Sequence, residues 1–410
     1  MKSEKMYHPL TLPLAIFIAV LIFASKGLAE TVLHAFRSGA GDGLAPYGRL
    51  ISDAEGNLYG TTALGGTSGA GVVFELAKPQ GSGAWTETIL YNFTGSNDGS
   101  QPYGGLIFDS AGNLYGTTFQ GGTSSAGTVY ELSPGQGGTW TENVLYSFAG
   151  GADGAGPQSD LIFDRSGDLY GTTTGGGSPG NGIVFELASG QGGVWTETVL
   201  HRFMTSEATS PRAAVIFGTR GELYGTLAND GSSGAGGVFR LDPPATKGGA
   251  WRETTLYTFT GGADGYGPLC RLVMFKGSLY GTTVVGGALG YGTIFQLTPP
   301  ASHHGAWTET TLHSFTCCGS DGFNPWAGLI IDKTGTFYGT TQFGGLPSNG
   351  GTVFQLRLQG GIWTESVLYS FIYGGNHFSA AGLLLGKSGT LYGTTVGSHG
   401  KSGMVFKLRP

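Results

Sequence analysis

The sequence predicts an all-β protein, a seven-bladed β-propeller made of four-stranded antiparallel blades. Three observations predict this fold: a pentapeptide repeat, four β-rich runs in every repeat, and chain ends that complete each other. Variants of Leu-Tyr-Gly-Thr-Thr recur seven times, with their tyrosines 54 to 58 residues apart, at Tyr59, Tyr115, Tyr170, Tyr224, Tyr280, Tyr338 and Tyr392. So regular a period is typical of a repeat architecture.

Each repeat contains four short runs of strand-forming residues separated by glycine-rich turns. In the second repeat these runs are GLIFD (105–109), NLYGTT (113–118), GTVYEL (127–132) and WTENVLYSF (140–148). We expect the first run to be the innermost strand and the last run to be the outermost. Asp109 and Gly112 join the first two runs in a pattern suited to a type I turn followed by a left-handed glycine. The central glycine of the pentapeptide is expected to allow close approach between blades.

The two ends of the repeat region predict how the ring closes. The last repeat stops after its third run, MVFKL (404–408), whereas residues 30–36 (ETVLHAF) resemble the fourth run of other repeats. Pairing of the N-terminal strand into the last blade would complete seven blades and remove an exposed edge. We therefore expect a single propeller domain over residues 30–410.

Residues 1–29 have the pattern of a signal peptide. Lys2 and Lys5 precede the apolar run 12–24, and small residues follow at Gly27 and Ala29. The alternative is a retained anchor, for which 13 apolar residues are short. The expected location is therefore secreted or extracellular, with no membrane span after cleavage. Three cysteines fit an exported protein that does not depend on disulfides, and one bridge involving Cys270, or none, is favoured over a ring between Cys317 and Cys318.

Composition and charge argue against several classes of function. The chain has 410 residues, 79 of them glycine, and a net charge of −6 without a basic block, so nucleic-acid binding is not expected. No motif predicts a catalytic residue or a metal ligand. Five turns carry Asp-Gly, at Asp42, Asp98, Asp153, Asp264 and Asp321. Turn formation is the favoured interpretation of these aspartates, with calcium binding as the alternative.

The outermost run carries a glutamate in all seven copies, at Glu30, Glu87, Glu142, Glu197, Glu253, Glu309 and Glu365. We interpret these charges as protection against pairing of exposed strand edges, rather than as ligands. Three histidines, His34, His201 and His313, take a slot that holds tyrosine in the other copies. They are expected to be packed substitutes for that ring.

The repeated pattern D-x-x-G-N-L-Y-G-T-T, G-x-G-T-V-F-E-L and W-T-E-x-V-L-Y-x-F resembles the choice-of-anchor tandem repeat family called GloVer. The resemblance covers residues 30–410. It implies an extracellular or cell-surface repeat protein without an established biochemical activity, often followed by a sorting or anchoring tail. This sequence ends without such a tail, so free secretion is expected here.

The positions where the repeats differ are the candidate binding residues. They lie just before the innermost strands, where the loops should converge on the mouth of the central channel. The candidates are Tyr47, Arg49, Tyr103, Gln158, Asp160, Arg212, Arg271 and Trp326. Flat aromatic faces combined with a few hydrogen-bonding groups suit a sugar. The competing interpretation is a solvent-exposed rim that tolerates any residue.

The expected function is therefore binding without catalysis, by a monomer whose partner is an extracellular glycan or a surface protein. One alternative is a hydrolase or lyase acting on a carbohydrate or lactone at the same mouth, with Asp160 and either Arg212 or Arg271. A second alternative is a purely structural surface protein. No cofactor is expected, apart from the calcium alternative at the Asp-Gly turns.

Overall fold

The structure is a computed structural model, and it describes residues 30–39, 41–204, 209–229, 234–246, 248–301, 305–317, 321–347, 349–372, 381–397 and 402–410. The predicted signal peptide, residues 1–29, lies outside the described residues. Within the described ranges, no helix is long and apolar enough to span a membrane.

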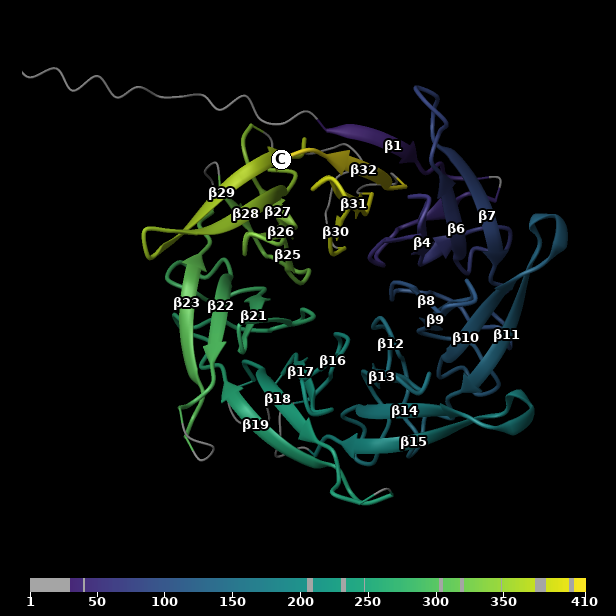
Figure 1. The fold of residues 1–410 in the computed structure, drawn as a ribbon, viewed down its shortest axis with the longest axis horizontal. Helices are drawn as coiled ribbons and strands as arrows, with labels where there is room; N and C mark the ends of the chain where they lie inside the picture. Colours follow the sequence, from purple (N-terminus) through teal and green to yellow (C-terminus); the bar gives the residue numbers. More distant parts are fainter. Residues whose placement is uncertain are drawn as a thin grey trace, which may run out of the picture.

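Seven four-stranded antiparallel sheets surround a central channel, which confirms the predicted propeller (Figure 1). We number the blades by their innermost strands: β3 (Ile51–Ser52), β8 (Ile107–Phe108), β12 (Ile162–Phe163), β16 (Ile216–Phe217), β20 (Val273–Phe275), β25 (Ile330–Ile331) and β30 (Leu384–Leu385). The second strands hold the pentapeptide: β4 (Leu58–Thr62), β9 (Leu114–Thr118), β13 (Leu169–Thr173), β17 (Leu223–Leu227), β21 (Ser278–Thr283), β26 (Phe337–Thr341) and β31 (Leu391–Thr395).

The third and fourth strands complete each blade toward the outside of the ring. The third strands are β6 (Val72–Ala77), β10 (Thr128–Pro134), β14 (Ile183–Ser189), β18 (Gly237–Asp242), β22 (Thr293–Thr298), β28 (Thr352–Gln359) and β32 (Met404–Leu408). The outermost strands of blades 1 to 6 are β7 (Thr86–Asn92), β11 (Trp140–Ser147), β15 (Trp195–Arg202), β19 (Arg252–Thr258), β23 (Thr308–Ser314) and β29 (Ile362–Ser370). Two small ribbons pair β2 (Gly43–Leu44) with β5 (Leu64–Gly65), and β24 (Gly322–Phe323) with β27 (Phe343–Gly344). Two 3-10 turns, η1 (Gln136–Gly138) and η2 (Gln191–Gly193), precede β11 and β15.

The N-terminal strand closes the ring, as the sequence predicted. Strand β1 (Thr31–Ala35) is the outermost strand of blade 7 and pairs antiparallel with β32, with Thr31 opposite Lys407. The first and last strands of the described chain therefore lie side by side (Figure 1). Phe36, which follows β1, packs edge to face on Phe74 of blade 1 and is 3 % exposed. The same segment thus joins the two ends of the chain and the two blades that meet there.

The turns between the first two strands have the predicted chemistry. Asp109 accepts hydrogen bonds from the backbone N–H groups of Ala111 and Asn113 at 2.8 and 2.9 Å, and Gly112 adopts a φ of 89°. The glycine in this slot has a positive φ in all seven blades, where a residue with a side chain would be strained. The aspartate is therefore a turn cap.

The central glycine of the pentapeptide makes room within its own blade, and the prediction of close approach between blades is wrong. Gly171 of β13 lies opposite Phe185 of β14, and the phenylalanine ring lies across the glycine. A Cβ atom on Gly171 would be 2.5 Å from Cζ of Phe185. The ring of Phe185 then contacts Phe148 of blade 2 at 5.2 Å between centroids. Glycine therefore seats the aromatic ring that makes the contact between blades.

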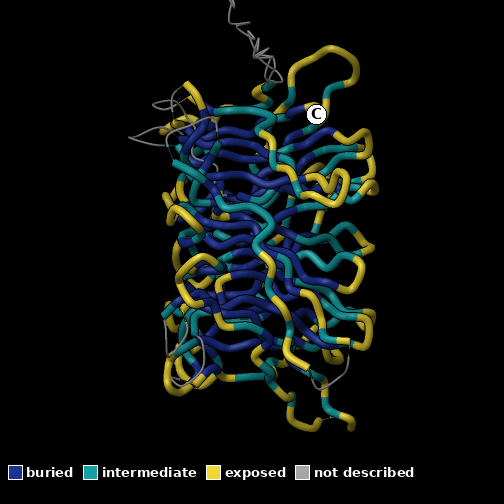
Figure 2. Tube along the Cα trace, turned by 90° about the vertical axis from the view of Figure 1, so that its left-hand side faces the viewer, coloured by how far each residue is buried: buried dark blue, intermediate teal, exposed yellow. Residues whose placement is uncertain are grey.

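The core is a set of seven apolar clusters, each spanning two neighbouring blades. One cluster joins Tyr115 and Phe148 of blade 2 to Leu169 and Phe185 of blade 3. In the side view, buried segments run through the middle of the ring, and exposed residues are concentrated in the loops on its two faces (Figure 2). The loops are therefore the parts of each blade that are available to a ligand.

The expectation about the cysteines is wrong. Cys270 is a free thiol buried just before β20, where its Sγ atom is 3.1 Å from the backbone nitrogen of Thr282. Cys317 is disulfide-bonded. A bridge therefore forms without Cys270, because that thiol is enclosed in the core.

Candidate functional site

One cavity of about 900 Å³ lies where the loops before the innermost strands converge. All eight candidate residues predicted from the sequence lie in its lining: Tyr47, Arg49, Tyr103, Gln158, Asp160, Arg212, Arg271 and Trp326. They come from blades 1, 2, 3, 4, 5 and 6. The innermost strands also contribute apolar residues, so the lining combines aliphatic walls with polar groups at its mouth and centre.

The pentapeptide fixes the loops that carry these residues. This role of its first threonine was not predicted from the sequence. Its first threonine donates a hydrogen bond to a backbone carbonyl just before the innermost strand of the next blade. Thr61 reaches Gly104 at 2.8 Å, and Thr394 of blade 7 reaches Pro46 of blade 1 at 3.0 Å. The other five bonds are Thr117 to Ser159, Thr172 to Ala213, Thr226 to Cys270, Thr282 to Ala327 and Thr340 to Ala381. Each accepting residue in blades 1 to 6 is next to a cavity residue in the sequence, so this ring of bonds positions the site.

Aromatic side chains form one part of the cavity lining. The rings of Tyr47 and Tyr103 meet edge to face at 5.3 Å, and Tyr103 meets Phe119 in the same way at 5.6 Å. Tyr47 and Trp326 remain 39 % exposed, so their faces are open to a ligand. Burial, with a smaller effect from Tyr47, raises the pKa of the Tyr103 hydroxyl, which keeps it protonated and able to donate.

A charged group lies deeper in the same cavity. The Nε atom of Arg49 is 3.4 Å from Oδ2 of Asp160, which comes from a blade two places away. The backbone N–H of Gly105, in the blade between them, donates to Oδ1 of Asp160 at 2.6 Å. Burial lowers the pKa of the Arg271 guanidinium, and Asp160 acts in the opposite direction. The centre of the cavity therefore holds two guanidinium groups and one carboxylate.

Small residues in the equivalent slots make space for these charged side chains. A Cβ atom on Gly105 would be 2.9 Å from Oδ1 of Asp160, and a Cβ atom on Gly382 would be 3.4 Å from Cδ of Arg49. A Cβ atom on Gly328 would be 2.6 Å from the carbonyl oxygen of Arg271. A side chain at Gly105 or Gly328 would therefore clash, whereas the distance at Gly382 is an ordinary contact, so the first two positions are less free to vary than the comparison between repeats suggested. The slots next to Arg49, Asp160 and Arg271 hold only glycine or alanine, which leaves room for the long side chains.

The geometry of Asp160 does not favour the hydrolase or lyase alternative. Both of its carboxylate oxygens have partners, the N–H of Gly105 and the guanidinium of Arg49. Among the described residues that line the cavity, Asp160 is also the single carboxylate. General acid–base chemistry usually requires two titrating groups within reach of the substrate. Arg212 lies exposed on the rim.

The outer-strand glutamates lie between blades, so their interpretation as edge protection is wrong. Glu197 of β15 is half-buried against the Asp-Gly turn of the preceding blade. Burial and the charge of Asp153 raise its pKa to about 7, and Arg202 acts weakly in the opposite direction. Asp153 itself accepts hydrogen bonds from the Tyr146 hydroxyl at 3.0 Å and from the N–H of Ala149 at 2.8 Å. The aspartate is a turn cap, as predicted, and the glutamate faces it from the next blade.

Replacing Glu197 by glutamine is expected to stabilise the protein at pH 8 and not at pH 4.5. Folding raises the pKa of Glu197, so the folded state binds the carboxyl proton more tightly than the unfolded state. The stability of the wild type therefore falls as the pH rises from the ordinary pKa of glutamate toward 7, where the carboxyl loses its proton in the folded state. The variant should gain about 1–2 kcal/mol over the wild type at pH 8, after allowance for the solvent that reaches a half-buried carboxyl. Urea unfolding at several pH values measures this difference.

The control for this pH dependence is Thr196→Gln, at the exposed neighbouring position on β15. Its effect on the free energy of unfolding should not change with pH, because no titrating group is removed. An equal effect of Glu197→Gln at pH 4.5 and pH 8 would contradict the prediction.

The three histidines in the tyrosine slot pack as predicted. His34, His201 and His313 each meet the phenylalanine two residues later, edge to face, at 4.7 to 4.8 Å between centroids. Tyr91 and Tyr146 pack on their phenylalanines in the same way, at 5.1 and 5.0 Å. A histidine in this slot therefore preserves the ring contact while it exchanges a hydroxyl for a ring nitrogen.

Several solved structures are similar to the chain at low sequence identity. A putative oxidoreductase (glucose dehydrogenase) from Thermus thermophilus is 16 % identical, with a TM-score of 0.45 over 77 % of this chain and 94 % of that one. PorZ, a surface component of the type-IX secretion system of Porphyromonas gingivalis, is 15 % identical, with a TM-score of 0.44 over 83 % of this chain and 44 % of that one. A protein of unknown function from Dyadobacter fermentans is 13 % identical, with a TM-score of 0.42 over 94 % of this chain and all of that one.

The repeat itself is diagnostic. No protein with a curated description matches the chain. The model of the Gloeobacter/Verrucomicrobia repeat matches residues 20–141, 80–283 and 248–410, which together cover all seven blades. The chain therefore belongs to the Gloeobacter/Verrucomicrobia repeat family.

Proposed function

We propose that the protein is a secreted, non-catalytic binding protein that holds an extracellular glycan at the mouth of its channel. The observation that carries this proposal is the cavity of about 900 Å³, whose lining combines the exposed aromatic rings of Tyr47 and Trp326 with charged side chains. Sugar rings present apolar faces that stack on aromatic side chains and hydroxyls that bond to charged and polar groups. The apolar run in residues 12–24 supports secretion of the chain.

The arrangement suits binding because the lining is held in place before a ligand arrives. Seven threonine hydrogen bonds fix the loops from one blade to the next, and the Arg49–Asp160 pair fixes the centre. A pre-organised site loses less conformational freedom when it binds, and this raises affinity. Trp326 and Tyr47 are the exposed aromatic anchors, and the Tyr103 hydroxyl and the Arg271 guanidinium are the donors.

Replacing Trp326 by alanine is expected to weaken glycan binding by about two- to tenfold, because a stacked aromatic ring contributes about 0.5–1.5 kcal/mol beyond the area it buries. A glycan array with the full chain selects the ligand, and titration calorimetry then measures the dissociation constant for wild type and variant. Melting temperatures of the two proteins should agree, since Trp326 is 39 % exposed.

The matched control is Tyr266→Ala, because Tyr266 is 38 % exposed and is not part of the cavity lining. Its dissociation constant should equal that of the wild type. Equal losses in the two variants would show that the glycan binds elsewhere. Absence of any saturable ligand would favour the purely structural alternative.

A further inference from the structure

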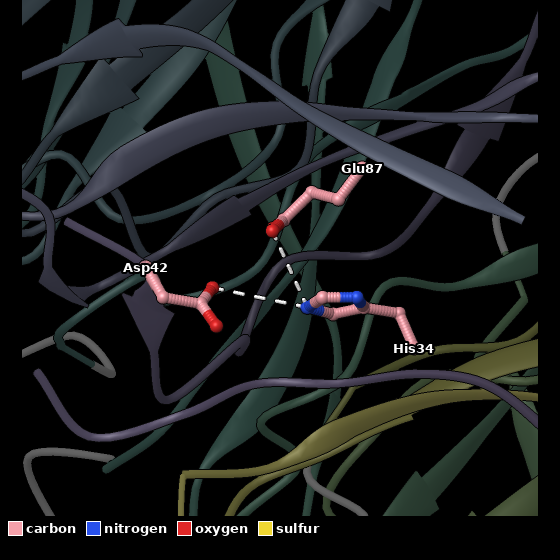
Figure 3. A group of neighbouring side chains, drawn as sticks. All are labelled: His34, Asp42 and Glu87. Atoms are coloured by element: carbon pink, nitrogen blue, oxygen red, sulfur yellow. Dashed lines mark ion pairs between the residues drawn. The ribbon is translucent and has the colours of Figure 1, made fainter. Parts of the chain in front are cut away.

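Three side chains that can each bind a metal meet at the junction where the ring closes (Figure 3). His34 comes from β1 of blade 7, Asp42 from the loop after it, and Glu87 from β7 of blade 1. The Nε2 atom of His34 points between the two carboxylates and is 3.8 Å from Oδ1 of Asp42 and 3.4 Å from Oε2 of Glu87. One ligand atom from each residue lies within 4.8 Å of the other two.

The polar atoms of this cluster are not satisfied by the described protein. The Nε2 atom of His34 and the Oε1 atom of Glu87 are buried, and neither has a hydrogen-bond partner among the described residues. The contacts of His34 with the two carboxylates, at 3.8 and 3.4 Å, are longer than ordinary N–H···O hydrogen bonds. Buried polar groups normally have a partner, and buried charges are paired or bind metals.

Blades with tyrosine in the same slot differ at the aspartate, although their glutamates Glu142 and Glu197 also keep a buried oxygen without a partner among the described residues. The Tyr91 hydroxyl donates to Oδ2 of Asp98 at 3.1 Å, and Tyr257 donates to Asp264 at 3.0 Å. A tyrosine hydroxyl supplies a proton to the aspartate, whereas a neutral imidazole supplies a lone pair. The exchange of tyrosine for histidine therefore converts a hydrogen-bonded junction into a set of three potential ligands.

The same combination occurs at a second junction. His313 of β23, Asp321 of the following loop and Glu365 of β29 also place one ligand atom each within 4.8 Å of one another. Nε2 of His313 forms a hydrogen bond with Oδ2 of Asp321 at 3.3 Å, so this imidazole, unlike that of His34, already has a partner. The two junctions thus share the three residue types and the spacing between histidine and aspartate. In both, the glutamate comes from the outermost strand of the next blade.

We propose that His34, Asp42 and Glu87 bind a divalent transition-metal ion, with Zn²⁺ as the best fit, and that His313, Asp321 and Glu365 form a second site of the same kind. One imidazole nitrogen and two carboxylate oxygens are a donor set that zinc accepts, with water in the fourth position. The charge of the ion balances the two carboxylates when the histidine is neutral.

The geometry fits such an ion. Ligand atoms at about 2.1 Å from zinc with tetrahedral angles lie about 3.4 Å apart. The distance from His34 to Glu87 equals this value, and the distance from His34 to Asp42 is 0.4 Å longer. The three ligand atoms lie within 4.8 Å of one another, so binding requires them to move closer to the ion. Oδ1 of Asp42 accepts from the N–H of Gly43 at 2.7 Å and keeps a second lone pair for the metal.

A metal at this place would tie the ring closed. His34 and Asp42 belong to the N-terminal segment that completes blade 7, and Glu87 belongs to blade 1. The ion would therefore add a further connection between blades 7 and 1. An ion that binds the folded state alone adds to its stability by mass action. The proposed role of this site is structural and does not depend on a glycan at the channel mouth.

Calorimetric titration of the metal-free full chain with Zn²⁺ tests the proposal. About two ions per chain are expected at saturable sites, one for each cluster. At a free zinc concentration of about 100 times the dissociation constant, each site should raise the melting temperature by about 3 °C. Titration with Co²⁺ should give the visible absorption bands of a tetrahedral site.

The matched variants are His34→Tyr and His313→Tyr, which install the tyrosine that other blades use at the same slot. Each should fold and lose one ion, and the double variant should lose both. The reverse exchange, Tyr91→His, should add a third ion with Asp98 and Glu142. If the double variant binds as much zinc as the wild type, or the wild type binds none, the proposal is wrong. Calcium binding that survives both substitutions would also contradict it, because the site would then be carboxylate alone.

Discussion

Replacing Gly171 by alanine is expected to lower the free energy of unfolding by about 3 kcal/mol, since overpacking a close-packed core forces strain into it. The new Cβ atom would be 2.5 Å from Cζ of Phe185 and 2.9 Å from Cδ2 of Leu161. Phe185 cannot move away freely, because its other side contacts Phe148 of the preceding blade. Urea unfolding of the variant and the wild type measures the loss.

Two further variants identify the cause of this loss. Gly151→Ala is the control, since a Cβ atom there meets no atom within 4 Å, and its free energy of unfolding should match the wild type. Phe185→Leu replaces the ring that lies across Gly171 by a smaller aliphatic side chain. The double variant Gly171→Ala/Phe185→Leu should lose less free energy of unfolding than the sum of the losses in the two single variants, because both substitutions affect one contact. Additive losses would show that strain against Phe185 is not the reason.

Replacing Phe36 by alanine is expected to cost about 3–4 kcal/mol, the usual range for removal of a buried phenylalanine ring. Phe36 anchors the closing segment, with its ring against Phe74 of blade 1 and its N–H donating to the carbonyl of Gly403 at 3.1 Å. We expect the loss to appear first as faster amide hydrogen exchange in β1 and β32, because closure of blade 7 depends on this anchor.

Phe148→Ala provides the comparison for the closing segment. Phe148 is fully buried and meets Phe185 at 5.2 Å, the same distance at which Phe36 meets Phe74. The stability loss should be similar, but faster exchange should be confined to blades 2 and 3. Unchanged exchange in β1 of the Phe36 variant would contradict the prediction that Phe36 holds the ring closed.

The ring was predictable because its signals are local and repeated. The period of Tyr115 and its equivalents gives the number of blades, and the match between residues 30–36 and the fourth strands gives the closure. Contacts between blades were not predictable. The half-buried position of Glu197 against Asp153 depends on how two separate sheets stack, which no local pattern states.

The candidate site was predictable in its membership and not in its internal contacts. Tyr47, Trp326 and the other cavity residues lie at positions where the seven repeats differ. Packing positions keep the same residue type in each repeat, so the variable positions indicated the site. The pairing of Arg49 with Asp160 across an intervening blade depends on the channel radius, which no sequence pattern states, and on how closely both residues approach Gly105. Glycan binding at this cavity stays a prediction.

The pairing of β1 with β32 sets the order in which the protein can be completed during synthesis. β1 leaves the ribosome before every other strand of the ring, and its partner leaves last. At typical rates of about 5–20 residues per second, the first strand waits roughly 20–80 s for the last one. During this interval the edge of β1 has no native strand partner, so blade 7 stays open until the final strand arrives.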